Sequence, residues 1–163
     1  MPLAGTIPWV VSALMPLSVQ IRAHELSGPE KETTLRAVSE VLARHEEIVF
    51  AYAHGSFLGK GAFRDLDLAL YLNPTPGCPV FLYELQIQQE ITSAIAAGFP
   101  VDVRVTNRAP ILFQYHAYRG RLLLDRDPDL RASIIAHVVS RYLDIKPVLE
   151  HYSREAFCRE PRS

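Results

Sequence analysis

The sequence has little cysteine and no excess of charge of either sign. Two cysteines, Cys78 and Cys158, are present among 163 residues, which is too few for a disulfide scaffold and fits no CxxC zinc spacing. Seventeen lysines and arginines balance eighteen aspartates and glutamates to a formal net charge of −1, whereas proteins that coat DNA or RNA carry a clear basic excess. We therefore expect a protein of the reducing cytoplasm that has no direct nucleic-acid partner.

Several motifs of cofactor and metal chemistry are also absent. The chain contains neither GxGxxG nor GxxxxGK followed by serine or threonine, which argues against dinucleotide-binding and P-loop folds. Its six histidines form no HxxxH or HExxH pair, so zinc chemistry is not indicated. His54 adjoins a Gly-Ser turn, but we interpret it as a packed residue at the end of a strand and not as a catalytic one.

The N-terminal segment is apolar without being a signal or a membrane span. No basic residue precedes Arg22, although a secretory signal begins with basic residues. Pro8 and Pro16 interrupt the apolar run, and a membrane span needs about 20 continuous apolar residues. We interpret residues 1–26 as an extension, expect it to be partly ordered against the core, and expect no membrane partner. Residues 27–163 then form one domain.

Hydrophobic periodicity predicts alternating helices and strands in the rest of the chain. The pattern predicts helices over residues 28–45, 81–97, 109–119 and 127–158. It predicts strands over residues 48–53, 66–72, 100–106 and 121–125. Ser27 and Glu30 form a capping box at the first helix, Gly98 is expected to close the second helix, and Pro147 is expected to kink or break the last one.

The order of these elements predicts the fold class. The connection between the first two strands is too short for a parallel crossover, so we expect these strands to be antiparallel. Residues 48–53 are almost wholly apolar, as in a strand that is buried on both faces. The chain is therefore expected to be α/β (α+β), with a mixed β-sheet flanked by helices and not a doubly wound one.

The loop between the first two strands carries the residues with the clearest chemistry. It reads GSFLGKGAFRDLD over residues 55–67, and three glycines in seven residues let a backbone approach a ligand as phosphate loops do. Ser56 offers a hydroxyl and a backbone N–H, while Lys60 and Arg64 supply positive charge. This pattern favours a phosphate site at Gly55 and Ser56.

Three carboxylates form the second part of the candidate site. Asp65 and Asp67, two residues apart at the start of a strand, point to the same side and repel each other unless a cation lies between them. Mg²⁺ suits that place because it takes one or two carboxylates together with phosphate oxygens and water. Asp102 lies on the polar side of another strand and adds the third carboxylate that a two-metal site needs. A structural role is the common alternative for an isolated DxD, but the preceding Gly-Ser and the later Asp102 favour metal binding.

These residues together resemble a known superfamily. Gly55-Ser56 followed by Asp65-Leu66-Asp67 is similar to the GS…DxD signature of the polymerase β-type nucleotidyltransferases, and most similar to their minimal nucleotidyltransferase (MNT) branch. Asp102 matches the third, strand-borne acid of that superfamily. The likeness covers roughly residues 33–155. Residues 107–110, 120–124 and 141–147 resemble the C-terminal half of MNT proteins that are encoded beside HEPN-domain toxins in prokaryotes.

The resemblance implies a polymerase β-like nucleotidyltransferase fold, an enzyme, and ATP as its substrate with two Mg²⁺ ions. In that family the MNT protein is the antitoxin, and it transfers AMP from ATP onto a tyrosine of its HEPN ribonuclease partner. The residues that the resemblance assigns are Asp65, Asp67 and Asp102 for catalysis and metal binding, and Gly55, Ser56, Lys60 and Arg64 for nucleotide binding. We expect the partner to dock on the C-terminal helix around Tyr142–Tyr152.

The chain departs from the family pattern at two places, and two other functions stay open. Residues 57–64 give an eight-residue spacer between GS and DxD where ten is usual, and Arg64 replaces the serine that commonly precedes the first aspartate. A small-molecule nucleotidyltransferase, for instance one that acts on an aminoglycoside, is the first alternative. A catalytically lapsed antitoxin that masks its partner by contact alone is the second.

Overall fold

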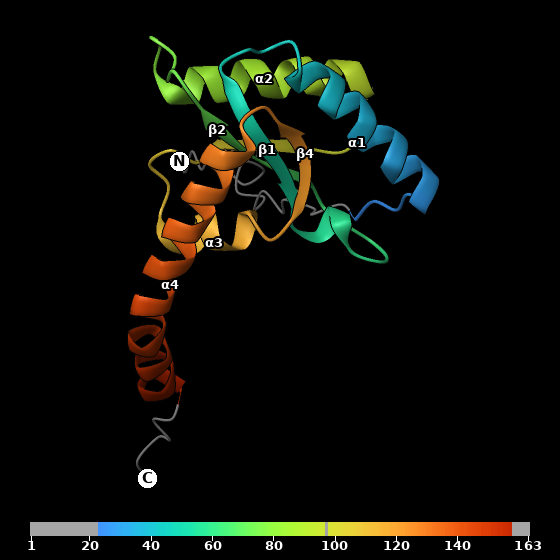
Figure 1. The fold of residues 1–163 in the computed structure, drawn as a ribbon. Coiled ribbons are helices and arrows are strands. Elements are labelled where there is room, and N and C mark those ends of the chain that lie inside the picture. Colours follow the sequence, from blue (N-terminus) through green and yellow to red (C-terminus); the bar gives the residue numbers. More distant parts are fainter. Residues whose placement is uncertain (1–22, 97, 158–163) are drawn as a thin grey trace, which may run out of the picture.

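A four-stranded sheet lies between two pairs of helices (Figure 1). The computed structural model describes residues 23–96 and 98–157. The helices are α1 (Gly28–Leu42), α2 (Val80–Ile95), α3 (Ile111–Ala117) and α4 (Pro128–Phe157), with a 3-10 turn η1 (Ser56–Leu58). The strands are β1 (Ile48–His54), β2 (Leu66–Leu72), β3 (Val101–Val105) and β4 (Arg121–Asp125).

The sheet is mixed, which confirms the predicted fold class. Its strand order is β3-β2-β1-β4. β1 runs antiparallel to β2 and to β4, and β2 runs parallel to β3. The parallel pair requires a crossover, and α2 supplies it.

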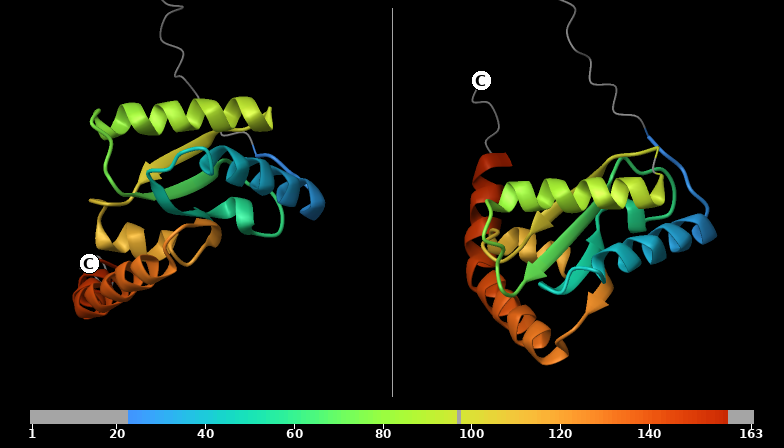
Figure 2. Two further views of the ribbon diagram at one scale, coloured as in Figure 1. Left: turned by 45° about the horizontal axis from the view of Figure 1, so that its top comes forward. Right: turned by 90° about the horizontal axis from the view of Figure 1, so that it is seen from above.

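The central strand β1 contacts a separate core on each side of the sheet. Ala51 and Ala53 belong to the core beneath α1 and α2, while Phe50 and Tyr52 belong to the core beneath α3 and α4. Figure 2 shows the two helix pairs on opposite faces. Since both faces are covered, β1 needs apolar residues at every position, as its sequence predicted.

The first helix begins as its sequence predicted. The Ser27 hydroxyl accepts from the backbone N–H of Glu30 (3.4 Å), and the Glu30 carboxylate accepts from the backbone N–H of Ser27 (2.8 Å). Leu35, Val38 and Leu42 are buried against the sheet. The capping box therefore fixes where α1 starts, and the apolar spacing fixes which face it buries.

One predicted helix end is wrong, and one predicted break does not occur. α2 ends at Ile95, and the left-handed residue that terminates it is Ala96 (φ 45°), not Gly98. The chain has to turn early because Phe99, only three residues later, packs against Phe63 in the core. α4 continues through Pro147 without a break. Proline there removes one hydrogen bond to a carbonyl one turn earlier, and an exposed helix face lets water satisfy that carbonyl.

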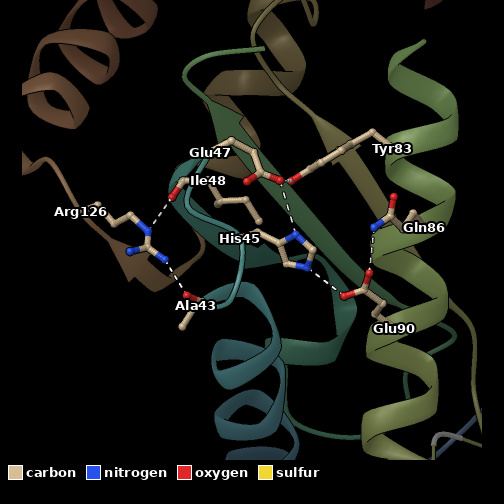
Figure 3. A network of polar contacts seen from close by, with 8 residues as sticks. All are labelled: Ala43, His45, Glu47, Ile48, Tyr83, Gln86, Glu90 and Arg126. Carbon is tan, nitrogen blue, oxygen red and sulfur yellow. Dashed lines mark hydrogen bonds and ion pairs between the residues drawn. The ribbon is translucent and has the colours of Figure 1, made fainter. Parts of the chain in front are cut away.

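A polar network fastens the end of the sheet where β1 begins (Figure 3). The His45 ring lies between Glu47 of the same turn (3.4 Å) and Glu90 of α2 (2.8 Å), and the Tyr83 hydroxyl donates to Glu47 (2.7 Å). Arg126 donates to two backbone carbonyls on either side of this turn. Burial opposes ionisation of Glu47, but its own backbone N–H and Tyr83 hold the pKa of this carboxyl below its usual range. The network joins α1, α2 and the chain after β4 at the end of the sheet opposite the candidate site.

Part of the predicted N-terminal extension lies outside the described residues. His24 forms two backbone hydrogen bonds with Phe63 (2.7 and 2.9 Å), and Leu26 packs against the core. The prediction for residues 1–22 concerns a segment that the structure does not describe. In the portion that is described, no helix combines the length and apolar character needed to cross a membrane.

Candidate active site

A glycine turn at the end of β1 brings backbone and carboxylate together. Gly55 has a φ of 78°, in the left-handed region that favours glycine. A Cβ atom at this position would overlap Oδ2 of Asp67. Ser56 then begins η1. Glycine at position 55 therefore permits both the turn and the close approach of Asp67. The sequence had predicted only a phosphate-binding role for Gly55.

The loop that follows is anchored from both sides. Phe57 and Phe63 are fully buried, with ring centroids 4.8 Å apart. Lys31 of α1 donates to the carbonyls of Gly59 (2.9 Å) and Gly61 (3.4 Å). The sequence reasoning missed these three anchors. Phenylalanines at both ends of a glycine-rich loop could have indicated the first two, but nothing near Lys31 in the sequence connects it with a loop about 30 residues away.

The candidate acids come together on the face of the sheet that carries α3 and α4. Asp67 of β2 pairs with Asp102 of β3 in the parallel register and with His54 of β1 in the antiparallel register. Paired residues of neighbouring strands point to the same face. Asp65 lies just before β2. The structure thus places His54, Asp67 and Asp102 in one row across three strands, with Asp65 beside it. These four residues are called the acid row below.

Electrostatic repulsion is strong in this row. Burial, together with the negative charges of Asp65 and Asp102 and against the positive charge of Arg64, raises the pKa of Asp67 to about 6. A carboxylate in this position is costly unless positive charge approaches it. The carboxylates that the sequence singled out therefore interact in the folded chain.

The donor chemistry of the row fits a divalent cation. Two carboxylates in register, a third beside them and a repulsion that raises the pKa of Asp67 are the conditions that a hard cation relieves. Across residues 23–96 and 98–157, no three histidine, cysteine, aspartate or glutamate side chains form a ready-made metal cluster. Asp65, Asp67 and Asp102 could hold Mg²⁺ only after side-chain adjustment, so their role as metal ligands stays a prediction.

Arg104 already neutralises part of the negative charge of Asp102 that a metal ion would otherwise neutralise. Its Nε atom lies 3.2 Å from Oδ2 of Asp102. Both side chains are substantially exposed, 58% for Arg104 and 44% for Asp102, so the ion pair is weak and readily exchanged. The alternating pattern of the strand predicted that Arg104 lies on the same polar side as Asp102, and the structure shows the two side chains in contact.

His54 packs against α3 beside the acids. Its ring lies edge-on to Phe113, with 5.5 Å between centroids. Burial lowers the pKa of His54, while Asp102 and Asp65 act in the opposite direction. Its Nε2 atom is buried and has no hydrogen-bond partner. The residue is packed, as the sequence suggested, and it also forms one end of the acid row.

The two loop cations differ in their relation to the acids. Arg64 is exposed at the entrance to β2, where its charge opposes the rise in the pKa of Asp67. Lys60 is exposed at the tip of the loop. The charge of Arg64 thus acts on the acid row. The assignments of Arg64 and Lys60 to nucleotide binding both stay predictions.

Comparison with known proteins places this geometry in a family. Residues 36–129 match the family described as polymerase beta, nucleotidyltransferase. No curated protein sequence matches the chain. The fold is shared by the Shewanella oneidensis complex of a tri-AMPylated HEPN toxin with its MNT antitoxin, at a TM-score of 0.61 and 13% identity over 78% of this chain and 99% of that chain.

Two further solved structures share the fold. One is the toxin–antitoxin MntA–HepT, with a TM-score of 0.60 and 13% identity over 78% of this chain and 99% of the other. The other is a toxin–antitoxin with AMP-PNP, with a TM-score of 0.62 and 14% identity over 76% of this chain and 98% of the other. The predicted likeness in fold to MNT proteins is confirmed. Because the family match covers more than half of the sequence, the chain belongs to the polymerase β-type nucleotidyltransferase family.

Proposed function

We propose that the chain is a Mg²⁺-dependent nucleotidyltransferase that transfers AMP from ATP to a tyrosine hydroxyl of a HEPN ribonuclease toxin and so acts as its antitoxin. The proposal depends mainly on one observation in a chain of this family. The backbone of Gly55 lies against the carboxylate of Asp67, and Asp67 is paired with Asp102 on the neighbouring strand. The neighbouring complex of a tri-AMPylated HEPN toxin with an MNT antitoxin supports the choice of acceptor. The neighbour with AMP-PNP, an ATP analogue, supports the choice of nucleotide.

The loop after β1 is suited to the phosphates of ATP. Gly55 and Ser56 begin η1 beside Asp67, where backbone N–H groups and the Ser56 hydroxyl can donate to phosphate oxygens. Arg64 stands next to the acid row and Lys60 at the tip of the loop. These residues would orient the β- and γ-phosphates, so that the α-phosphorus lies over Asp67 and Asp102.

The acid row would hold the metal and take up a proton. Asp65, Asp67 and Asp102 would bind Mg²⁺, which supplies neutralising charge for the triphosphate. The acceptor hydroxyl oxygen forms a bond to the α-phosphorus, and the bond from the α-phosphorus to the bridging oxygen breaks, releasing pyrophosphate. Asp102 receives the hydroxyl proton. Catalysis of this kind depends mainly on positioning and charge neutralisation.

An antitoxin that has lost catalysis is the second candidate. Arg104 lies on Asp102 at 3.2 Å, and the described residues contain no ready-made cluster of three metal ligands. Such a protein would mask its partner by contact alone. It would still bind the HEPN toxin but would transfer nothing to it.

Transfer of label from ATP tests the proposal. The chain is incubated with ATP labelled at the α-phosphate, Mg²⁺ and the HEPN protein encoded beside it, and an aminoglycoside is offered in a parallel reaction. We expect label on the HEPN protein, its loss in Asp102→Ala, and its retention in Asp129→Ala, a matched exposed aspartate on α4. Label on the aminoglycoside alone would contradict the antitoxin function, and a toxin that binds without being labelled would favour the second candidate.

A further inference from the structure

A cavity of about 490 Å³ opens beside the acid row, at the end of β3. Two of its wall residues also contact the row. Arg104 donates to Asp102, and the Phe113 ring packs edge-on against His54. Gly55 and the phosphate loop lie at the end of the sheet where β3 begins, whereas the cavity lies farther along β3. A molecule in the cavity would therefore approach the acids from the side opposite the phosphate loop.

The charged part of the cavity wall favours an anionic group. Its charged residues are Arg104, Arg108 and Glu84. One carboxylate oxygen of Glu84 already accepts from the backbone N–H of Val105 at the end of β3 (2.8 Å). Within the part of the chain that the structure describes, Arg108 has no ion pair and Arg104 engages Asp102 through Nε alone. Two guanidinium groups therefore remain open toward the cavity, which suits bidentate binding of a carboxylate.

The rest of the cavity wall favours an aromatic side chain. Its remaining residues are apolar, namely Val80, Val105, Ala109, Pro110 and Phe113. A planar ring can lie between such side chains while its polar end points out of the apolar region. One wall residue, Arg104, donates to Asp102, so the cavity is connected to the acids on its polar side. The two arginines of the wall suit an acidic side chain, and the apolar residues suit a tyrosine ring. The ligand that fits both parts is a protein segment that carries a tyrosine and an acidic residue.

The surface outside the cavity indicates that this segment belongs to a protein. Val80 lines the cavity and is 44% exposed, and Phe81 and Leu85, one turn apart on α2, are 59% and 48% exposed. Both views of Figure 2 draw the first turn of α2 and α3 toward the same lateral end of the sheet, although the two helices cover opposite faces of it. Phe81 and Leu85 each directly follow a wall residue of the cavity, Val80 and Glu84, in the sequence of α2. Such exposed apolar side chains provide a contact surface that a free nucleotide would not use.

We infer that this cavity is the acceptor site of the chain. It receives a tyrosine of the protein partner together with an adjacent acidic residue, which Arg108 binds, while Phe81 and Leu85 contact the surrounding partner surface. The inference rests on the proposed function, because a transferase needs its acceptor on the side of the acids away from the triphosphate. It places the principal docking surface on α2 and α3 instead of on the C-terminal half of α4.

Two charge-altering variants and two controls test the acceptor site. Arg108→Glu and Phe81→Asp change exposed residues of the cavity and its rim, Arg36→Glu reverses an exposed charge on α1, and Leu143→Asp alters the alternative surface on α4. Binding of the adjacent HEPN protein and binding of AMP-PNP with Mg²⁺ are each measured by calorimetry. We expect the first two variants to weaken partner binding about tenfold or more and to leave AMP-PNP affinity within about twofold, with both controls unchanged.

The outcomes separate this inference from the proposed function. Loss of AMP-PNP affinity in Arg108→Glu would assign the cavity to the nucleotide and overturn the inference. Weakening by Leu143→Asp with no effect of Arg108→Glu or Phe81→Asp would overturn it in favour of α4, even where AMP transfer proceeds normally. Partner binding that depends on Arg108 and Phe81 without any AMP transfer would support the docking site and contradict the transferase. No binding to the wild-type chain would contradict both.

Discussion

Asp67 and Asp102 occupy paired positions on the two parallel strands β2 and β3. Neighbouring strands lie about 4.8 Å apart, and paired side chains leave the same face. The α2 crossover between these strands thus brings together two carboxylates from distant parts of the sequence. Their mutual repulsion is a cost of folding that a nucleotide–metal complex would remove, so the same pair connects the stability of the chain with its proposed chemistry.

Removal of the Asp67 charge should stabilise the chain at neutral pH. The folded chain keeps the proton on Asp67 up to about pH 6, while the ordinary value for this group is 3.8. The folded state therefore binds more protons between these values, and stability falls as pH rises through them. We expect Asp67→Asn to raise the free energy of unfolding at pH 7 by about 1–2 kcal/mol, after allowing for solvent screening, and to have little effect near pH 3.

Chemical denaturation at both pH values measures this effect. Asp144→Asn, at an exposed position of α4, is the matched control and should change stability by less than about 0.5 kcal/mol at either pH. A large loss of stability in Asp67→Asn at pH 7 would show that Asp67 is a structural ion-pair partner. The fold would then not carry the repulsion that we assign to the acid row.

Replacement of Gly55 by alanine should impair both folding and nucleotide binding. Its left-handed φ and the overlap of a Cβ atom with Asp67 add two separate costs, together about 2–4 kcal/mol. Gly77→Ala is the matched control, because a Cβ atom there meets nothing within 4 Å. Thermal melting and AMP-PNP titration would check the pair, and equal behaviour of the two variants would mean that the Gly55 turn does not constrain Asp67.

Substitution of Lys31 should reduce the stability of the chain, whereas substitution of Lys60 should reduce only its affinity for the nucleotide. Lys31 holds the carbonyls of Gly59 and Gly61 and lies over the rings of Phe57 (5.5 Å) and Phe63 (5.2 Å). We expect Lys31→Met to lower stability by about 1–2 kcal/mol, because the loop loses its only lysine anchor in the described chain. Lys60→Met should leave the melting temperature unchanged and weaken AMP-PNP binding a few-fold. The reverse pattern would exchange the roles of these lysines.

Nucleotide binding should require a divalent cation. The acid row and the triphosphate both carry negative charge and cannot converge without neutralisation. Calorimetric titration with ATP should therefore give measurable affinity with Mg²⁺ or Mn²⁺ and none, or at least tenfold less, with EDTA. Equal affinity in both conditions would contradict metal binding by Asp65, Asp67 and Asp102.

The sequence predicted most of the fold because its local patterns agree with one another. The capping box at Ser27 and Glu30, the apolar run of β1 and the short first connection determine α1 and an antiparallel start to the sheet. Helix ends were less predictable. Ala96 adopts a conformation for which glycine was expected two residues later, since packing of Phe99 decides where the chain turns. At Pro147 the local signal also failed to predict the structure, because α4 continues through this proline.

The candidate site was predictable where one motif carries it and not where distant elements meet. Gly55, Asp65 and Asp67 lie within one short stretch of sequence, from the end of β1 to the start of β2, so their spacing indicated their chemistry. Lys31 reaches that loop from α1, and the cavity beside Asp102 is formed by α2, β3 and α3 together. Such contacts depend on tertiary packing, which local spacing does not specify.

The mass of the HEPN partner after co-expression tests the central claim most directly. The HEPN toxin that we propose as the partner is purified after co-expression with the wild-type chain and with Asp67→Asn, and its intact mass is measured. We expect the toxin to gain the mass of at least one AMP with the wild-type chain and to stay unmodified with the variant, the modified residue being a tyrosine. An unmodified toxin in a stable complex with the wild-type chain would contradict AMP transfer.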